Sequence, residues 1–459
     1  MLRPVKLDVS GALTQEPQHL LECLTDFYSN LSDHRPLGIA VSGGSDSLGL
    51  LYGLAAIVPP HKLVALTVDH GLRPAAADEA RWVKAQCRRL GIRHETLKWQ
   101  SGQPVTGLQA AARAARYRLL VQASARLGLA AVVTAHTRDD QYETLAMRRA
   151  RSASDDAPGL AGIPTATLFE ERLWVLRPLL ELTRETIREF LRSRGLAGWV
   201  EDPSNTDTRF ERVRVRAQLE HHTPQQEGPD PAQIAMRRFQ LASDAAALLD
   251  AACRVEGDGP VRVRFDATAR MDVVTAALEA LIDWQGGAAR PLDRRGKATL
   301  ASFLASTSGK ANGSVMSLGR TLVRRQGAFL TVERERRDVA RLMLPPGDCG
   351  VWDKRFEICN RSKASPLYVS GASAGVLPCF TRNQREYSTQ FHRDDGVIGG
   401  FTCRPLLGRS SRILPVDQLP LAQTLARLAR GRPLPRCPWG ESHGIAALTA
   451  IKVQRQTPV

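Results

Sequence analysis

The sequence predicts an α/β protein in which a parallel sheet with flanking helices is followed by smaller, mostly helical or α+β C-terminal domains. From residue 37 onward, apolar runs typical of buried strands alternate with segments of helical periodicity. A loop of glycine, serine and aspartate, residues 42–47, separates the first of these strands from the helix after it. Such alternation requires crossover connections, so we expect the strands to run parallel.

The N-terminal half accounts for the sheet. The expected strands are residues 37–41, 63–68, 93–98 and 131–135. The expected helices are residues 48–56, 76–90, 108–127, 139–149 and 184–194, the last ending at Gly195 as a helix C-terminus often does. Ligands of such sheets bind at the carboxyl ends of the strands, so we expect the functional residues there.

The C-terminal half has two breaks. Residues 221–231 contain three prolines, one glycine and no apolar residue, which is typical of a linker, and a second break lies at residues 344–347. We therefore expect an N-terminal domain over 1–220, a linker over 221–231, a central domain over 232–344 and a C-terminal domain over 345–459. The central domain should contain helices at 232–254, 272–284 and 294–304 and a hairpin of 321–325 with 328–333. The tail should contain a helix at 419–430.

Composition limits the class of protein. A net charge of +16 with 43% hydrophobic residues indicates a folded protein with a polyanionic partner, and nucleic acid is favoured over membrane. Neither a signal peptide nor a membrane-spanning run is apparent, because Asp8 and Glu16 interrupt the N-terminus and apolar stretches stay below about 18 residues. The eight cysteines form no Cys-x-x-Cys pair, so we expect reduced thiols and a cytoplasmic location. The oligomeric state is not predicted.

Residues 42–47 predict a phosphate-binding loop. Glycines without a Cβ let the backbone turn tightly and direct N–H groups at an anion, and serine hydroxyls and the helix N-terminus add donors. A Walker loop would need a lysine, which is absent here. Asp46 suits a partner of Mg²⁺ and pyrophosphate. An N-capped turn is the alternative, although it does not explain two adjacent glycines and three hydroxyls. The candidate ATP-binding residues are Ser42, Gly43, Gly44, Ser45, Asp46 and Ser47.

Further polar residues follow the second and fourth strands. Asp69 and His70 are expected at the active edge of the sheet, or else in an ordinary polar turn. The segment 136–143 offers an imidazole and three carboxylates, His136, Asp139, Asp140 and Glu143. Asp140 and Glu143 fit an acidic capping box, which would leave one or two of these groups for chemistry.

Two arginine-rich segments suggest contacts with RNA. Helical spacing places Gln109, Arg113, Arg116 and Tyr117 on one face of the helix 108–127, which suits phosphates and base stacking, although a solvated face would look similar. Four arginines after residues 201–205 suit a phosphate backbone or, alternatively, a solvated surface. These four are Arg209, Arg212, Arg214 and Arg216.

Taken together, the segments resemble the tRNA(Ile)-lysidine synthetases, within the N-type ATP pyrophosphatases. The matching patterns are Ser-Gly-Gly-x-Asp-Ser at 42–47, Asp-His-Gly-Leu-Arg at 69–73, Gln-x-Ala-Ala-Arg-x-x-Arg-Tyr at 109–117, His-x-x-Asp-Asp-Gln-x-Glu-Thr at 136–144, Arg-Pro-Leu-Leu at 177–180 and Glu-Asp-Pro-Ser-Asn at 201–205. They cover residues 37–216. Residues 151–154 depart from the usual Gly-Ser-Gly turn, and Val213 stands where asparagine is common, which affects local loop or RNA contacts.

The resemblance implies a reaction and roles for residues. It implies that ATP adenylates the wobble cytidine of a CAU-anticodon tRNA(Ile) and that L-lysine displaces AMP, which changes codon specificity from AUG to AUA. The implied catalytic residues are Asp46, which would be nearest Mg²⁺ and pyrophosphate, and Arg113, His136, Asp139 and Asp140. Asp69 and His70 join the ATP site, and Arg116, Tyr117, Arg209, Arg212, Arg214 and Arg216 the RNA site. Arg427, Arg430, Arg432 and Arg436 would bind the tRNA body.

Two other functions stay open on the sequence alone. A tRNA thiolation enzyme would share the glycine loop, but such enzymes generally need catalytic cysteines or a cluster, and this chain has no Cys-x-x-Cys. A non-catalytic ATP- or RNA-binding module would have no use for the paired acids Asp139 and Asp140.

Overall fold

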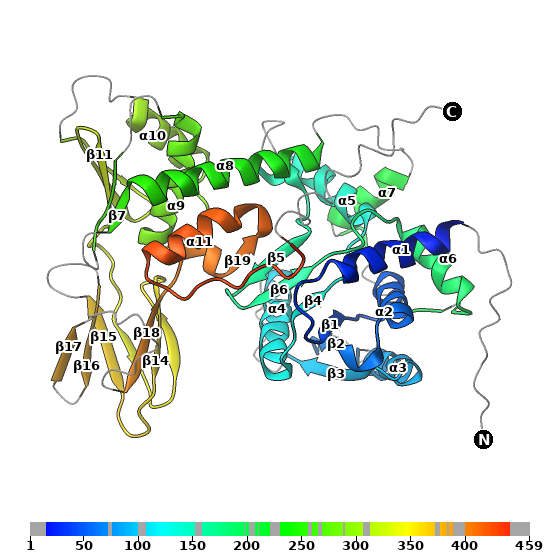
Figure 1. Cartoon of the computed structure of the whole chain (residues 1–459). Helices are drawn as coiled ribbons and strands as arrows, with labels where there is room; N and C mark the ends of the chain where they lie inside the picture. The colour runs from blue at the N-terminus through cyan, green and yellow to red at the C-terminus, as the bar shows by residue number, and fades with distance from the viewer. Residues whose placement is uncertain are drawn as a thin grey trace. The chain divides into compact units, whose positions relative to one another are not determined.

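The chain divides into two compact units, which are described separately (Figure 1). The first comprises residues 1–235 and 437–459, and the second residues 236–436. The structure is a computed structural model that describes residues 15–71, 76–99, 107–151, 158–196, 198–201, 207–209, 211–220, 230–255, 259–264, 269–287, 290–305, 313–371, 377–382, 385–388 and 400–440.

The first unit is built on a mostly parallel sheet. Its strands are β1 (Leu37–Ala40), β2 (Leu63–Asp69), β3 (Arg93–Lys98), β4 (Ala131–Val133), β5 (Ala166–Phe169) and β6 (Leu173–Leu176). Their spatial order is β5-β6-β4-β1-β2-β3, and only the β5–β6 pair is antiparallel among these strands. Every residue of β1 is buried, as expected for a strand covered on both faces. The predicted parallel α/β sheet is confirmed.

Helices flank this sheet. They are α1 (Gln15–Ser29), α2 (Ser45–Ile57), α3 (Ala76–Arg89), α4 (Leu108–Leu127), α5 (Arg138–Arg149), α6 (Arg184–Ser193) and α7 (Glu211–Glu220), with 3₁₀ turns η1 (Pro60–Lys62) and η2 (Pro158–Ala161). Glycines let α2 approach its neighbours: a Cβ on Gly53 would lie 2.5 Å from Leu24 of α1, and one on Gly49 would overlap Ile187 of α6. Thus α1, α2 and α6 form one packed layer.

The chain returns to the first unit near its C-terminal end. Trp439 packs edge-on against Phe27 of α1, with 4.9 Å between the ring centroids. The backbone N–H of Ser32 donates to the carbonyl of Pro438 over 2.8 Å. Residues from both ends of the sequence therefore complete this unit.

The second unit begins with helices and a five-stranded sheet. After α8 (Pro231–Ala252), whose first residues belong to the first unit, come β7 (Cys253–Val255), β8 (Val261–Arg264), α9 (Met271–Gly286), α10 (Arg294–Ala305), β9 (Val315–Leu318), β10 (Thr321–Gln326) and β11 (Phe329–Arg334). The strands are ordered β7-β8-β11-β10-β9. The predicted hairpin is confirmed as β10–β11, in which Gln326 pairs with Phe329 and Gly327 adopts a φ of 59°.

The rest of the second unit is mainly antiparallel. One sheet has the order β12-β15-β16-β17 and the other β13-β14-β18. These strands are β12 (Leu342–Leu344), β13 (Cys349–Trp352), β14 (Phe356–Asn360), β15 (Leu367–Gly371), β16 (Pro378–Arg382), β17 (Arg385–Ser388) and β18 (Phe401–Pro405). Trp352, Ile358 and Phe380 belong to one core that joins both sheets. Then follow η4 (Gly408–Ser411), β19 (Ile413–Pro415), η5 (Val416–Gln418) and α11 (Leu419–Leu428).

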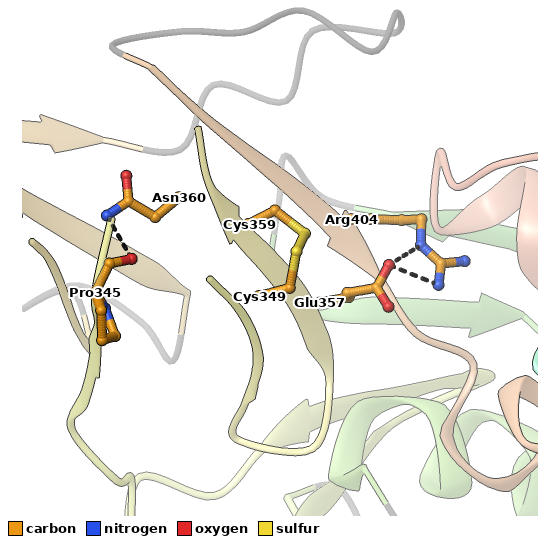
Figure 2. Close-up of a disulfide and its surroundings, with 6 residues drawn as sticks. All are labelled: Pro345, Cys349, Glu357, Cys359, Asn360 and Arg404. Carbon is orange, nitrogen blue, oxygen red and sulfur yellow. Dashed lines mark hydrogen bonds and ion pairs between the residues drawn. A yellow bond between two sulfur atoms is a disulfide. The ribbon is translucent and has the colours of Figure 1, made fainter. Parts of the chain in front are cut away.

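The expectation that all eight cysteines are reduced is wrong. Cys349 and Cys359 are direct partners in the β13–β14 ladder and form a disulfide (Figure 2). The other six cysteines, all within the described part of the chain, are free. Next to the disulfide, Arg404 of β18 pairs with Glu357 of β14 over 3.0 Å. The sequence separation of ten residues does not predict this disulfide, because only the register of the hairpin brings the two thiols together.

The four expected domain limits stay a prediction. Residues 221–229, which hold most of the expected linker, lie outside the described residues. Among the helices that the structure does describe, none has the length and apolar character needed to span a membrane.

Candidate active site

The loop after β1 has the geometry of an anion-binding turn. Gly43 has a φ of +93°, which side chains other than glycine rarely adopt, and a Cβ there would lie 2.9 Å from Val200. Ser47 Oγ accepts the N–H groups of Ser42 and Gly43 over 3.2 Å each, and donates to the carbonyl of Gly44 over 2.9 Å. The serine hydroxyls therefore hold the loop at the start of α2.

The first turn of α2 provides the positive end of a helix. The first N–H groups of an α-helix have no partner within the helix, so those of Ser45, Asp46 and Ser47 suit an anion. The Asp46 carboxylate accepts the Ser45 hydroxyl over 3.0 Å and is 24% exposed. Burial, with the nearby Asp140 charge, raises the pKa of Asp46 although Arg184 opposes this.

The helix α5 brings two acids to the same place. Its capping box joins Thr137 and Asp140: Asp140 Oδ2 accepts the Thr137 N–H over 2.9 Å. The predicted capping box of Asp140 with Glu143 is therefore wrong, because α5 begins at Arg138, one residue earlier than expected. Asp140 caps the helix with one oxygen and directs the other, Oδ1, to the site. Asp46, Asp140 and Glu143 together are called the carboxylate cluster below.

Arg184, at the first position of α6, connects the whole cluster. Its guanidinium lies 3.4 Å from Asp46 Oδ2, 2.7 Å from Asp140 Oδ1 and 3.0 Å from Glu143 Oε1. Its backbone N–H donates to Asp139 Oδ2 over 2.9 Å. Sequence reasoning missed this residue. The available signal was a cation in the first turn of a helix, where the dipole disfavours positive charge unless acids surround it.

Two arginines of α7 complete the pairing. Arg212 contacts Asp140 Oδ1 and Glu143 Oε2 over 2.6 Å each, and Arg216 contacts Glu143 Oε1 over 2.7 Å. Burial alone would raise the pKa of Glu143, but hydrogen bonds and charge from Arg216, Arg184 and Arg212 outweigh it and lower that pKa to about 2. Three guanidinium groups thus neutralise three carboxylates.

A second group of arginines, Arg113, Arg116 and Arg177, forms no ion pair with a carboxylate within the part of the chain that the structure describes. Arg177, 3% exposed, donates to the Pro164 carbonyl over 2.8 Å and to Thr167 Oγ1 over 2.9 Å, and among the described residues its Nε has no hydrogen-bond partner. Burial, followed by the charges of Arg177, Arg116 and Arg113, holds the pKa of His136 well below its usual value. This region combines a neutral imidazole with excess positive charge, and it suits phosphate or an electron-rich base.

Several expected RNA contacts are placed differently by the structure. Tyr117 is only 7% exposed and stacks on Phe169 with 3.8 Å between the centroids, so the prediction of a base-stacking surface is wrong there. Its ring joins the core because position 117 of α4 faces the sheet. Arg212 and Arg216 are engaged by the carboxylate cluster. Arg209 pairs with Asp207 over 2.7 Å at the surface, and Arg214 donates to the Thr208 carbonyl over 2.7 Å.

Other expected residues lie at the carboxyl edge of the sheet or on its helices. Asp69 Oδ1 accepts the Gly71 N–H over 2.9 Å, so its carboxylate takes part in a polar turn, and His70 packs edge-on to Trp99 at 6.0 Å. Arg113 is exposed on α4 beside Tyr117. Of the expected motifs, residues 72–73 and 202–205 lie outside the described residues. In the second unit, Arg427 pairs with Asp250 over 2.6 Å.

The sheet and the loop define a protein of the PP-loop class, and a family model described as a PP-loop domain matches residues 16–223. A tRNA(Ile)-lysidine synthase of Mesorhizobium japonicum is 36% identical over 455 residues, which cover 91% of this chain and 97% of that protein. A tRNA(Ile)-lysidine synthase of Rhizobium meliloti is 37% identical over 375 residues, which cover 79% of this chain and 81% of that protein. The chain belongs to the tRNA(Ile)-lysidine synthase family. Among solved structures, the U34-tRNA thiolase NcsA from Methanococcus maripaludis is 15% identical with a TM-score of 0.38, covering 45% of this chain and 73% of that one.

Proposed function

We propose that this protein uses ATP to join free L-lysine to C2 of the wobble cytidine in a tRNA(Ile) with a CAU anticodon, releasing AMP and pyrophosphate. Membership of the family supports the reaction. The structural observation that carries the proposal is the position of Asp46, which belongs both to the PP-loop and to the carboxylate cluster. A triphosphate on the loop and a cationic nucleophile on the acids would therefore lie in one site.

The first step is adenylation of the cytidine. The C2 oxygen attacks the α-phosphorus of ATP, and the bond to pyrophosphate breaks. The N–H groups at the start of α2 and the glycine loop receive the leaving pyrophosphate, and excess positive charge at Arg113, Arg116 and Arg177 stabilises the phosphate in the transition state. Asp46 would hold Mg²⁺, with phosphate oxygens as the other ligands, and the ion would neutralise pyrophosphate charge; the described residues offer no cluster of three or more metal-binding side chains.

The second step joins lysine to the base. The lysine ε-nitrogen forms a bond to C2, the C2–oxygen bond breaks, and AMP leaves. The amine must first lose a proton, because an ammonium group has no lone pair. Asp140 and Glu143 are the acids that would orient the substrate amine, with Asp139 tied to the backbone of α6. Burial, followed by the charges of nearby arginines, holds the pKa of His136 low, so its imidazole is unprotonated and is a further candidate to receive the proton of the amine. The modified base then pairs with A rather than G, so the codon read changes from AUG to AUA.

The RNA would contact the protein through basic side chains of both units. In the first unit these are Arg116, Arg209 and Arg214, and also Arg212 and Arg216 once they leave the acids. In the second unit they are Arg427, Arg430, Arg432 and Arg436. The net charge of +16 supports this partner.

The decisive experiment supplies the purified protein with [³H]lysine, Mg²⁺-ATP and transcribed tRNA(Ile) bearing the CAU anticodon, with elongator methionine tRNA as the control. Label should enter the isoleucine tRNA and not the control. Release of AMP and pyrophosphate without incorporation of lysine would refute lysine as the nucleophile, and sulfur transfer would then be tested. Absence of ATP turnover in folded protein would refute catalysis.

A further inference from the structure

The helix α7 lies beside α5 (Figure 1), and two of its arginines contact the acids that would receive the amino-acid substrate. Arg212 and Arg216 are four residues apart and therefore project from the same face of α7. Arg212 spans two acids, with Nη2 2.6 Å from Asp140 Oδ1 and Nε 2.6 Å from Glu143 Oε2. A substrate ammonium group would need these same oxygens. On the proposed function, Arg212 therefore stands where the ammonium group of the substrate would bind.

The charge balance of the carboxylate cluster limits the number of cations that it can bind at one time. Both oxygens of Glu143 already have partners, Arg184 and Arg216 on Oε1 and Arg212 on Oε2. Glu143 is 1% exposed, so water cannot screen an additional cation there. A substrate amine would add a fourth positive charge to three carboxylates and three guanidinium groups. One or more arginines must therefore move away when the substrate binds.

The arginines that move are those of α7. The Arg184 side chain is only 15% exposed, and its backbone is fixed to Asp139 at the start of α6. Arg212 and Arg216 are 44% and 29% exposed, and they lie on a helix of ten residues. Because these two guanidinium groups reach solvent, they can leave the acids without becoming buried and unpaired. A displaced guanidinium is an excellent ligand for phosphate, which it binds through two parallel hydrogen bonds.

We infer that lysine and RNA bind to this protein cooperatively, because each of them separates Arg212 and Arg216 from Asp140 and Glu143. This inference rests on the proposed function. Lysine takes the acids and releases the arginines for RNA phosphates, whereas RNA takes the arginines and leaves the acids open for lysine. Linkage makes the effect reciprocal: the factor by which RNA tightens lysine binding equals the factor by which lysine tightens RNA binding.

The test measures lysine binding to the full-length protein by titration calorimetry, without ATP, in the presence and absence of saturating tRNA(Ile) transcript. For the wild type we expect the Kd of lysine to fall by about fivefold or more when RNA is present, in the usual range of coupling between sites. The double variant R212Q/R216Q should bind lysine more tightly than the wild type when RNA is absent. Its coupling factor should approach one, with RNA saturation verified by fluorescence anisotropy.

The matched control is R214Q, since Arg214 lies on the same helix and contacts backbone carbonyls rather than the acids. It should lower RNA affinity and retain the wild-type coupling factor. The inference is overturned if the wild type binds lysine with the same Kd with and without RNA, or shows no measurable binding in either state. It is also overturned if R212Q/R216Q keeps the full coupling factor while its thermal stability is unchanged. Incorporation of [³H]lysine into tRNA by the wild type is measured in parallel, to separate the coupling from the proposed function. If lysine is incorporated, an unfavourable binding result refutes the coupling alone. If lysine is not incorporated, the proposed function fails.

Discussion

Replacement of Arg184 by glutamine tests whether one buried guanidinium holds the carboxylate cluster together. The change removes the contacts of 3.4, 2.7 and 3.0 Å to Asp46, Asp140 and Glu143 while keeping a polar side chain of similar reach. Breaking a buried ion pair by removing one partner costs about 3–5 kcal/mol. Arg212 and Arg216 still compensate two of the three acids, so we expect a loss of about 2–3 kcal/mol in the free energy of unfolding at pH 7.

The stability difference between wild type and R184Q should depend on pH in a definite direction. In the wild type the pKa of Glu143 is about 2, below its value of 4.5 in the unfolded chain. Its pairing therefore stabilises the fold fully above pH 4.5, and this contribution is lost as the pH falls from 4.5 toward 2. R184Q has less of this stabilisation to lose. The difference in stability between wild type and R184Q should thus shrink as the pH is lowered below 4.5.

Urea denaturation at pH 7 and at pH 4, followed by tryptophan fluorescence and circular dichroism, measures both effects. The control is R192Q on the same helix, because Arg192 pairs with Glu185 at the surface and both side chains are more than half exposed. That variant should change stability by less than about 0.5 kcal/mol. If R184Q matches R192Q at pH 7, or if its deficit grows in acid, then Arg184 does not hold the cluster as described.

Three further outcomes follow from the structure. Thiol titration in denaturant without reductant should find six free cysteines, and removing the disulfide with C349S and C359S should cost about 2–3 kcal/mol for a loop of this length; eight free thiols would contradict the pairing. G49V should destabilise the first unit by about 1–3 kcal/mol, because the new side chain overlaps Ile187, and an unchanged melting temperature would contradict the packing of α2 on α6. D46N should lower the rate of pyrophosphate release by about 100-fold or more while the melting temperature stays within a few degrees, and normal release would exclude Asp46 from that step.

Local sequence signals located the sheet and its loop well. The limits of β3 and α4 were predicted to the residue, and β1, β2 and β4 within two residues. The apolar runs of β1, β2 and β4 and the helical period of α4 are strong, whereas the run of β3 is weaker. Asp46 and Asp140 were expected near one another from the rule that ligands bind at the carboxyl ends of parallel strands, and the structure places both within reach of Arg184. Their catalytic roles, and that of His136, stay a prediction. Those features depend on a few neighbouring residues.

Features that depend on tertiary structure were not accessible in this way. Arg184 reaches Asp46 across 138 residues of sequence, and only the packing of α6 on α2 reveals it. The aromatic ring of Tyr117 was assigned to RNA because helical spacing shows which residues share a face of the helix. It does not show whether that face packs on the sheet or is open to solvent. The pair β5–β6 and most strands after residue 340 are short, and short apolar runs do not distinguish strand from buried helix.

The contact of Trp439 with Phe27 has a consequence for synthesis on the ribosome. At about 5–20 residues per second, roughly 10–40 s pass between the emergence of residue 235 and that of residue 439. Throughout this interval α1 lacks the aromatic cover that the finished chain provides, although its sheet and loop have already been made. The catalytic half of the molecule is thus begun first and completed last, and no nascent chain that stops before Trp439 has the finished first unit.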